Sequence, residues 1–396
     1  MVQGSAGAQA GGGASLRRRL LLVISAVVFI DTMFYAVITP LLPELSHQVG
    51  LSKLSAGVLT ASYAAGNLAA ALPGGALAVR RGPRFTVCVG LTLMVASIVA
   101  FGWLDSAWSL DLARFVEGVG GACSWAGGMA WIVGATPVAQ RGAVIGRVLG
   151  AAIGGALFGP AIGAIASATG RAALFTGLGL AALALVAIVT TLPEELESSE
   201  QGVGSVIRVM LRPPMLRGMW LMVLPAMVSG ALNVLGPLQL HVFGAGAGVI
   251  GAIFLLAAAV EAGLSPVAGR VSDRRGRMLP LRAGLAALAA TLVCFTLPGT
   301  ALELGLLIIL ICVVLAVFWA PAMAQMSDLA ERYEIDQAHA AALMNLAWAA
   351  GQIVGSACGG ATAGAFGDLF PTAVAAGLCL LSFVLLSFTA GTRSTA

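Results

Sequence analysis

Four ionisable side chains stand inside long apolar runs of the sequence, where a charge is costly. They are Asp31, Arg114, Glu117 and Glu261. At the centre of a bilayer a charge costs about 3 kcal/mol or more, so such residues face a partner or a water-filled cavity and mark ion or substrate pathways. Asp31, in FIDTMFYAVITPLLPEL (29–45), can hold a proton or a small cation. These residues therefore predict proton coupling within a membrane protein.

Arg114 is the one basic residue well inside a run, and it needs an acid as a partner. Glu117 lies one turn away on the same helix face, and Asp31 could reach Arg114 from another segment. The pair Arg114–Glu117 would then either take part in proton coupling or only order the helix. Glu261, in LLAAAVEAGLSP, is a candidate second proton or cation site; the alternative is a neutral acid bonded within the bundle.

Aromatic and amide side chains in the same runs are candidates for contact with a substrate. An aromatic ring attracts a cation over its face, which suits a lipophilic cation held by Asp31. Most such side chains in a helical bundle simply pack, so we expect only a part of them to touch substrate. Besides Asp31, the candidates for substrate binding are Tyr35, Tyr63, Asn67, Trp125, Asn233, Trp319, Asn345 and Trp348.

No metal centre is predicted. His47, His241 and His339 are far apart in the sequence and fall near expected helix ends, and all six cysteines fall in apolar runs. Buried thiols of this kind are small packing residues more often than metal ligands. We also expect no cofactor, with a proton gradient as the energy source.

The elements that position these residues are membrane helices. The chain has 396 residues, 59% hydrophobic and only 10% charged, against about 25% charged in a soluble domain. Apolar runs of about 20 residues, enough to span the bilayer, recur along it. We predict an all-α membrane protein with twelve transmembrane helices, at roughly 20–43, 55–78, 85–104, 108–133, 144–167, 172–192, 216–240, 247–268, 281–298, 301–323, 338–363 and 371–390.

The two halves of the chain repeat each other. GGALAVRRGPR (74–84) is echoed by AGRVSDRRGRM (268–278), GALFGPAIG (155–163) by GQIVGSACG (351–359), and Pro40 by Pro237, at offsets of 194, 196 and 197 residues. Parallel halves place a substrate site at their interface, near the midplane. We expect a disordered tail (1–16), a six-helix bundle (17–192), a cytoplasmic linker (193–215) and a second, pseudo-symmetric six-helix bundle (216–392).

The distribution of basic residues predicts the orientation. With both termini in the cytoplasm, 18 of the 21 Lys and Arg fall at cytoplasmic loops and span ends. Lys53 and Arg171 fall in the outer loops, and Arg114 lies inside a span. This bias follows the positive-inside rule. We expect a multi-pass protein of the cell membrane, a monomer, whose partners are a small-molecule substrate, protons and lipid, with no nucleic acid.

Across residues 17–392 the sequence resembles the major facilitator superfamily, and within it the twelve-span drug:proton antiporter family. GRVSDRRGR (269–277) is similar to the family's loop motif G-x-L-a-D-r-x-G-r. The resemblance implies that this loop latches the closed cytoplasmic side; the alternative is a basic loop that only sets topology. The residues concerned are Gly269, Asp273, Arg274, Gly276 and Arg277, and in the copy after span 2 Gly75, Arg80 and Gly82, with Val79 where the family has an acid.

Two further stretches resemble family motifs. GALFGPAIG is similar to the antiporter motif G-x-x-x-G-P-x-x-G: Gly155, Gly159 and Gly163 let a neighbouring helix approach closely, and Pro160 kinks the helix. This resemblance implies exchange rather than uptake, and the alternative is generic small-residue packing. LDLARFVEGVGGA (110–122) is similar to L-x-x-x-R-x-x-q-G, which implies a link between Arg114 and proton coupling.

The first span resembles that of the vesicular amine transporter branch, where an acid precedes a P-x-x-P pair, here Pro40 and Pro43. This implies that Asp31 meets the ammonium group of a substrate; the alternative is a structural acid. That branch also places acids in spans 10 and 11. Here the corresponding places are apolar in span 10 and Asn345 in span 11, so the full set of charges is missing.

These observations favour a proton-coupled antiporter that exports small amphiphilic, cationic compounds, such as drugs or natural products, by alternating access. The alternative is a uniporter or proton symporter of the same fold that imports a small metabolite. An intramembrane enzyme would need a Ser/His site, paired acids or a metal cluster at matched depth, and no His lies mid-span. A purely structural membrane protein would need neither the repeat nor three buried acids.

Overall fold

The computed structural model describes residues 3–137, 140–193, 208–335 and 337–391, and in these ranges every regular element is a helix. The first half contains α1 (Gln3–Val49), α2 (Lys53–Arg81), α3 (Pro83–Trp103), α4 (Ala107–Gly134), α5 (Arg141–Thr169) and α6 (Arg171–Thr190). The second contains α8 (Pro213–Val242), α9 (Ala247–Arg275), α10 (Met278–Val293) with the short η2 (Cys294–Thr296), α11 (Ala301–Arg332), α12 (Gln337–Ile353), the π turn η3 (Val354–Cys358), α13 (Gly359–Phe366) and α14 (Leu369–Gly391). The all-α fold class predicted from the sequence is confirmed.

Every predicted span overlaps one pass of the chain, with α12, η3 and α13 forming a single pass. Within the described ranges, nine helices are long and apolar enough to cross a membrane. The three passes outside this set are α2, α4 and α12–α13. They carry Asn67, the pair Arg114 and Glu117, and Asn345, and α12 ends at Ile353, where η3 interrupts the helix. These polar side chains contact other helices, as polar groups do in a membrane bundle.

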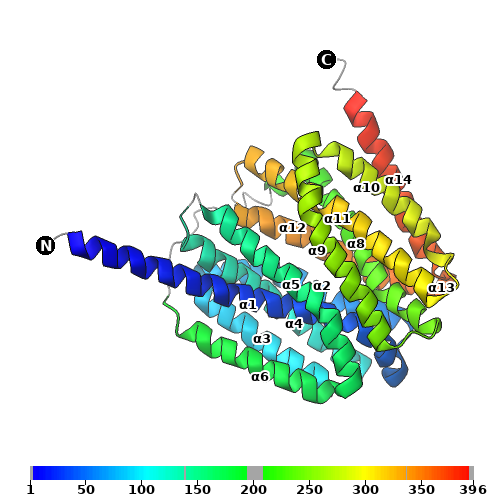
Figure 1. Ribbon diagram of the computed structural model, residues 1–396, viewed down its shortest axis with the longest axis horizontal. Helices are drawn as coiled ribbons and strands as arrows, with labels where there is room; N and C mark the ends of the chain where they lie inside the picture. The colour runs from blue at the N-terminus through cyan, green and yellow to red at the C-terminus, as the bar shows by residue number, and fades with distance from the viewer. Residues whose placement is uncertain (1–2, 138–139, 194–207, 336, 392–396) are drawn as a thin grey trace.

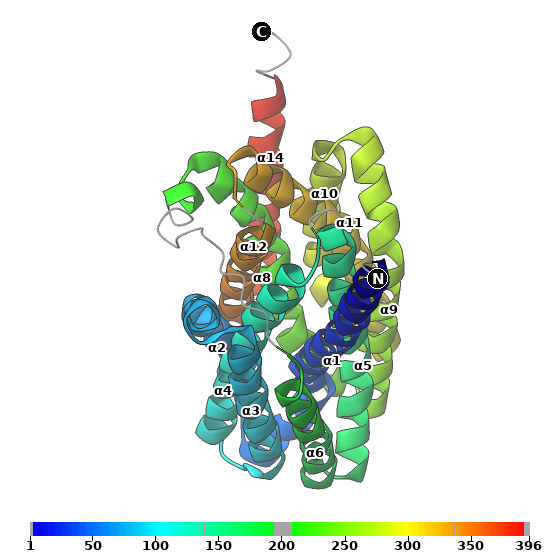
Figure 2. The same cartoon turned by 90° about the vertical axis from the view of Figure 1, so that its left-hand side faces the viewer.

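Successive passes run in opposite directions, so helix ends alternate between two sides of the molecule. We call the side that carries both chain termini the terminal side, and the side of the Val49–Lys53 and Val242–Ala247 connections the far side. Figure 1 shows the first bundle (α1–α6) and the second bundle (α8–α14) converging at the far side, while the two termini lie at diverging ends. Figure 2 shows the same separation from the terminal side of the first bundle.

The hydrophobic core consists of two clusters, one shared by the two bundles and one within the first bundle. One cluster joins both bundles and includes far-side residues such as Leu41, Leu45, Leu240 and Ile250. A second cluster belongs to the first bundle alone and includes Leu20, Ile24, Leu91, Ile132 and Val189, toward the terminal side. Apolar burial therefore holds the two bundles together on the far side.

Two close helix crossings join the bundles, and the repeat relates them. Gly57 of α2 lies against the Ser356 carbonyl of η3. Gly251 of α9 lies against α5, where an added Cβ would be 2.9 Å from the Pro160 carbonyl oxygen. The offsets are 194 from Gly57 to Gly251 and 196 from Pro160 to Ser356. The π turn of η3 therefore occupies the place of the proline in α5, and both interrupt regular helix hydrogen bonding where the bundles cross.

The glycines of the α5 motif pack directly on α1. An added Cβ on Gly159 would lie 2.6 Å from the Met33 carbonyl oxygen, and Gly155 and Gly163 lie equally close to α1. In the second bundle Gly351, Gly355 and Gly359 pack on α8 at Val223, Met227 and Ala231. The matching contacts on α1 are at Phe29, Met33 and Val37, so α1 maps onto α8 at an offset of 194.

This offset corrects one expected repeat. It matches Pro237 to Pro43, three residues from the Pro40 that the sequence comparison suggested. Two prolines one turn apart made both alignments plausible from the sequence. The helix packing decides between them because it fixes the register of α1 and α8 independently.

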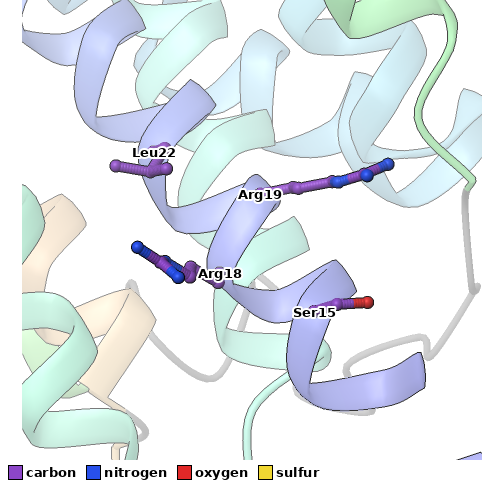
Figure 3. A pocket seen from close by; sticks show the side chains of 4 residues that line it. All are labelled: Ser15, Arg18, Arg19 and Leu22. Atoms are coloured by element: carbon purple, nitrogen blue, oxygen red, sulfur yellow. The ribbon is translucent and has the colours of Figure 1, made fainter. Parts of the chain in front are cut away.

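The N-terminal segment differs from the expected disordered tail. α1 begins at Gln3, although glycine, the commonest residue of this segment, disfavours the helix; the segment continues the long helix that follows it. Figure 3 shows a shallow, open hollow on this end of α1, with Arg18 and Leu22 on one side of the helix and Arg19 and Ser15 on the other. Most of the expected linker, 194–207, lies outside the described residues.

Candidate functional site

Asp31 is fully buried where α1, α2 and α4 meet. Its Oδ1 accepts a hydrogen bond from the Tyr63 hydroxyl at 2.9 Å, and its Oδ2 accepts one from Trp125 Nε1 at 2.9 Å. Gly121 makes room for the carboxylate, since a Cβ there would lie 2.6 Å from Oδ1. No Lys or Arg of the described residues forms an ion pair with Asp31. The carboxyl group therefore has two neutral donors and no fixed counter-ion.

Arg114 is also buried, and its partner is Glu117. Its Nη1 donates to the two Glu117 carboxylate oxygens at 3.1 and 3.0 Å. It also donates to two backbone carbonyls of α1, from Nη1 to Phe34 at 2.9 Å and from Nη2 to Tyr35 at 3.1 Å. Of the two acids that the sequence offered, the structure pairs Glu117 with Arg114. This pair ties α4 to α1 one turn from Asp31.

Three aromatic rings form a cluster that includes Tyr63, the donor to Asp31 Oδ1, and one of them comes from the other bundle. Tyr35 of α1 lies 5.0 Å from Tyr63 of α2 and 5.3 Å from Trp348 of α12, measured between ring centroids. Tyr63 and Trp348 meet edge to face at 6.4 Å. The Tyr63 ring also covers the Arg114 guanidinium, whose Cζ is 5.3 Å from the ring centroid. We call Tyr35, Tyr63 and Trp348 the aromatic trio.

An amide pair continues this contact between the bundles. Asn345 of α12 donates through Nδ2 to Oδ1 of Asn67 in α2 at 2.8 Å, with the orientation of both amides assigned from the hydrogen bond. Asn67 lies one turn from Tyr63, and Asn345 lies one turn from Trp348. The aromatic trio and the amide pair thus form one layer that crosses from the first bundle to the second next to Asp31.

Of the remaining predicted site residues, Asn233 lies beside the Tyr35 hydroxyl of the aromatic trio, whereas Trp319 and Glu261 lie apart from Asp31. Asn233 of α8 and Trp319 of α11 are half-buried, and Trp319 packs against the shared core. Glu261 of α9 is also half-buried, and no described side chain donates a hydrogen bond to its carboxylate. At the offset of 194 its counterpart in the first bundle is Asn67, so the two side chains take equivalent places in their bundles. Among the described residues, Asn233 reaches the Asp31 site through Tyr35, and no hydrogen bond or ion pair among them joins Trp319 or Glu261 to Asp31.

The loop between α9 and α10 is fixed by Arg277. Its guanidinium donates to Asp328 Oδ2 of α11 at 3.1 Å, to Ser272 at 3.3 Å and to Asp273. The hydrogen bonds to Asp328 and then Asp273 raise the pKa of Arg277 above its usual value. Gly276 has φ +81°, a conformation that favours glycine. The loop therefore links the terminal-side ends of α9 and α11 within the second bundle.

In the matching loop of the first bundle Pro83 takes the place of Arg277. The Arg277 network therefore has no counterpart there among the described residues, and Arg84 donates to the Leu192 carbonyl at 3.0 Å. Gly82 has φ +91°, as Gly276 does, so the turn is preserved. Arg80 and Arg274 are exposed at equivalent places, and Gly75 and Gly269 have open space around them. Val79, which replaces the acid, is 63% exposed. The turn is shared by both bundles, whereas the ion pairs occur in the second.

A family comparison now identifies the architecture. The model of the Major Facilitator Superfamily matches residues 24–338. The chain belongs to the major facilitator superfamily. The superfamily consists of membrane transporters, and the apolar helices described above agree with a multi-pass membrane protein.

Relatives within the superfamily are distant. The transporter C18.02 of Schizosaccharomyces pombe, uncharacterised, is 30% identical over 136 residues, which cover 32% of this chain and 30% of the relative. YcaD of Escherichia coli, also an uncharacterised superfamily transporter, is 28% identical over 263 residues, 63% of this chain and 66% of the relative. The chain thus spans less than two thirds of the length of these curated relatives.

Solved superfamily structures share the fold. A bacterial homologue of the human lysosomal transporter Spinster, inward-facing and occupied, superposes with a TM-score of 0.79 at 14% identity, covering 95% of this chain and 97% of that one. A D-xylose–proton symporter superposes with a TM-score of 0.74 at 17% identity, covering 93% and 96%. Similarity at these identities shows the fold alone.

Sequence reasoning missed two features of the site. Gly121, which makes room for the Asp31 carboxylate, stands in the run GVGGA and was read only as part of a motif. The second lies on the far side: the His47 and His241 Nε2 atoms are 3.1 Å apart, which was missed because the two residues are 194 positions apart. That spacing equals the repeat offset, and this was the available signal.

Proposed function

We propose that this superfamily transporter is a proton-coupled antiporter that exports small amphiphilic cations. The observation that carries the proposal is the setting of Asp31: a buried carboxyl group with two neutral donors, no counter-ion among the described residues, and aromatic rings beside it. Arg114, the nearby base, is already paired with the Glu117 carboxylate. A cationic substrate would supply the charge that Asp31 lacks.

The proposed mechanism is competition between a proton and the substrate at Asp31. When ionised, the carboxylate binds an ammonium group, and the faces of the aromatic trio add cation–π attraction. When protonated, the same group no longer holds a cation. The Tyr63 hydroxyl and Trp125 Nε1 keep the carboxyl group oriented in both states. Each transport cycle then exchanges protons for substrate.

Alternating access would come from rocking of the two bundles about the site. The bundles are in contact on the far side and through the aromatic trio and amide pair. The proposal places the termini in the cytoplasm of a cell-membrane protein, so the far side, where the bundles are in contact, would face the outside. It acts as a monomer, with the proton gradient as its energy source.

The orientation has its own test. Gln48 is exposed on the far side and Arg332 is exposed on the terminal side. In a background without the six native cysteines, an impermeant thiol reagent applied to intact cells should label a Cys at Gln48 and spare one at Arg332. The reverse pattern would invert the topology.

Arg114 and Glu117 are proposed as positioning residues for coupling. Arg114 holds the Phe34 and Tyr35 carbonyls of α1, so the pair fixes the register of α4 against the helix that carries Asp31. Glu261 is the proposed second proton site, because its carboxylate is half-buried and has no donor among the described residues. Neither role requires contact with the substrate.

A second candidate is proton-coupled or passive uptake of a small neutral metabolite. The amide pair beside aromatic rings favours it, because amides and rings are the groups that bind sugar hydroxyls and sugar faces. The D-xylose–proton symporter superposes over 93% of this chain. In that reading Asp31 would carry only a proton, and the amide pair would select the substrate.

Transport by purified protein separates the two. In proteoliposomes with an imposed pH gradient, lipophilic cations should be driven against the proton flow, whereas neutral sugars should not move. Asp31→Asn should abolish this flux. Asp105→Asn, the same change at an exposed far-side pair with Arg171, is the matched control and should retain it. Sugar uptake with protons, without any cation flux, would establish the second candidate instead.

A further inference from the structure

The far side holds a pair of histidines that the transport proposal does not use. His47 lies in the last turn of α1 and His241 in the last turn of α8. Their Nε2 atoms are 3.1 Å apart, and both side chains are exposed. Because α1 maps onto α8 at an offset of 194, the repeat places two equivalent histidines next to each other across the boundary between the bundles.

The spacing of the two nitrogens suits two ligands of one metal ion. A tetrahedral Zn²⁺ with Zn–N bonds of about 2.0–2.1 Å holds its ligand nitrogens about 3.3 Å apart. The observed Nε2–Nε2 distance is 3.1 Å, and the rings meet at 66° with centroids 5.1 Å apart. A shift of a few tenths of an ångström would therefore let the two Nε2 atoms bind one metal ion.

One of the two rings is already held for metal binding. His241 Nδ1 faces the Ala245 carbonyl oxygen at 3.4 Å, across the turn made by Gly244 at φ +83°. A proton on Nδ1 that points at this carbonyl leaves the Nε2 lone pair free, and metal-bound histidines are oriented by such contacts. His241 therefore presents Nε2 to His47 in the form that a metal requires.

The ligand set selects the class of metal. Neutral imidazole suits Zn²⁺, Ni²⁺ and Cu²⁺, whereas Mg²⁺ and Ca²⁺ need oxygen ligands. Glu44, one turn before His47, already accepts hydrogen bonds from Gln48 at 2.8 Å and from Ser167. We therefore assign two protein ligands, with water in the remaining positions because both rings are exposed.

We propose that His47 and His241 bind a divalent transition-metal ion of the Zn²⁺ class, which clasps the two bundles together on the far side. The site exists only while this side is closed, as do the ion pair from Lys53 to Asp368 at 2.6 Å and the Gly57 crossing. A ligand that binds one of two states stabilises that state. Bound metal should thus hold the far side shut and slow transport, whatever the substrate.

The test is Zn²⁺ binding to the purified full chain, by calorimetry or by competition with a chromophoric chelator. His47→Ala and His241→Ala should each weaken binding by at least about tenfold, because loss of even an indirect partner of a ligand costs 10–100-fold. His339→Ala, on the terminal side, is the control and should bind as wild type does. The exposed histidines can be replaced without loss of fold, which the thermal midpoint without Zn²⁺ checks.

Two outcomes would overturn the proposal. If neither far-side substitution weakens binding, the ion lies elsewhere; if only one does, a single histidine binds an adventitious ion without bridging the bundles. The bridge has a second readout that involves no transport. Zn²⁺ should narrow the distance distribution between spin labels at Gln48 and Val242 in the Cys-free chain, and an unchanged distribution would refute the clasp. Neither readout depends on proton or cation transport at Asp31, so failure here leaves the proposed function standing.

Discussion

The Tyr63 hydroxyl donates a hydrogen bond of 2.9 Å to Oδ1 of Asp31. The bond joins α2 to α1 inside the first bundle, and the Tyr63 ring contacts Trp348 of the second bundle. One side chain therefore touches both the proposed cation acceptor and the partner bundle. In the proposed mechanism, a change in the protonation of Asp31 would therefore act through Tyr63 on its contact with Trp348, which must separate when the bundles rock.

Tyr63→Phe should weaken cation binding while leaving the aromatic trio in place. The phenyl ring keeps the contacts with Tyr35 and Trp348, but Asp31 loses one of its two donors. A hydrogen bond to a charged group is worth about 1.5–3 kcal/mol, so cation affinity should fall by about tenfold or more. Equilibrium binding of a labelled lipophilic cation to purified protein measures this. Unchanged affinity would mean that the Tyr63 hydroxyl does not support the ionised carboxylate.

Gly121→Ala should disable the site through its added methyl group. The new Cβ would lie 2.6 Å from Asp31 Oδ1 and 2.9 Å from the Tyr63 hydroxyl, so the carboxyl group must move. Gly134→Ala is the matched control, because it is in the same helix and nothing lies within 4 Å of its Cβ. Cation efflux should be lost in the first variant and retained in the second. Equal efflux in both would show that the geometry around Asp31 is not critical.

Asp273→Asn should slow turnover more than Val79→Asp does. Asp273 and Asp328 both bind Arg277, whereas Val79 is exposed and a new carboxylate there would stay in water. Exposed ion pairs are worth about 0.2–1 kcal/mol each, so the loss should be a few-fold. Initial rates of efflux at saturating substrate test this. A normal rate in Asp273→Asn would reduce the loop to a determinant of topology.

The helices could be predicted from the sequence because a bilayer demands long apolar runs and permits few exceptions. All twelve spans overlap observed passes for this reason. The passes of α2, α4 and α12–α13, which are outside the nine long apolar helices, were predicted from the same kind of apolar run. The helix that begins at Gln3 was not predicted, since a composition rich in Gly, Ala and Ser is typical of a flexible tail.

The contacts of the site could be predicted only in part. The candidates Asp31, Arg114 and Trp348 stood out by type and position, but their partners depend on how helices rotate against one another. Glu117 and Asp31 were equal candidates for Arg114, and the packing of α4 on α1 decided for Glu117. Hydrogen bonds between residues far apart in sequence could not be predicted from any spacing rule. These are the bonds of Tyr63 and Trp125 to Asp31 and of Asn345 to Asn67.

The most direct test of the central claim is substrate-induced proton release from purified protein in a weakly buffered solution. If Asp31 exchanges a proton for a cation, adding a lipophilic cation to wild-type protein should release protons in proportion to the cation bound. Asp31→Asn should release none, and Asp105→Asn should release as much as wild type. Proton release of wild-type size from folded Asp31→Asn protein would contradict the account and make Glu261 or Glu117 the coupling site.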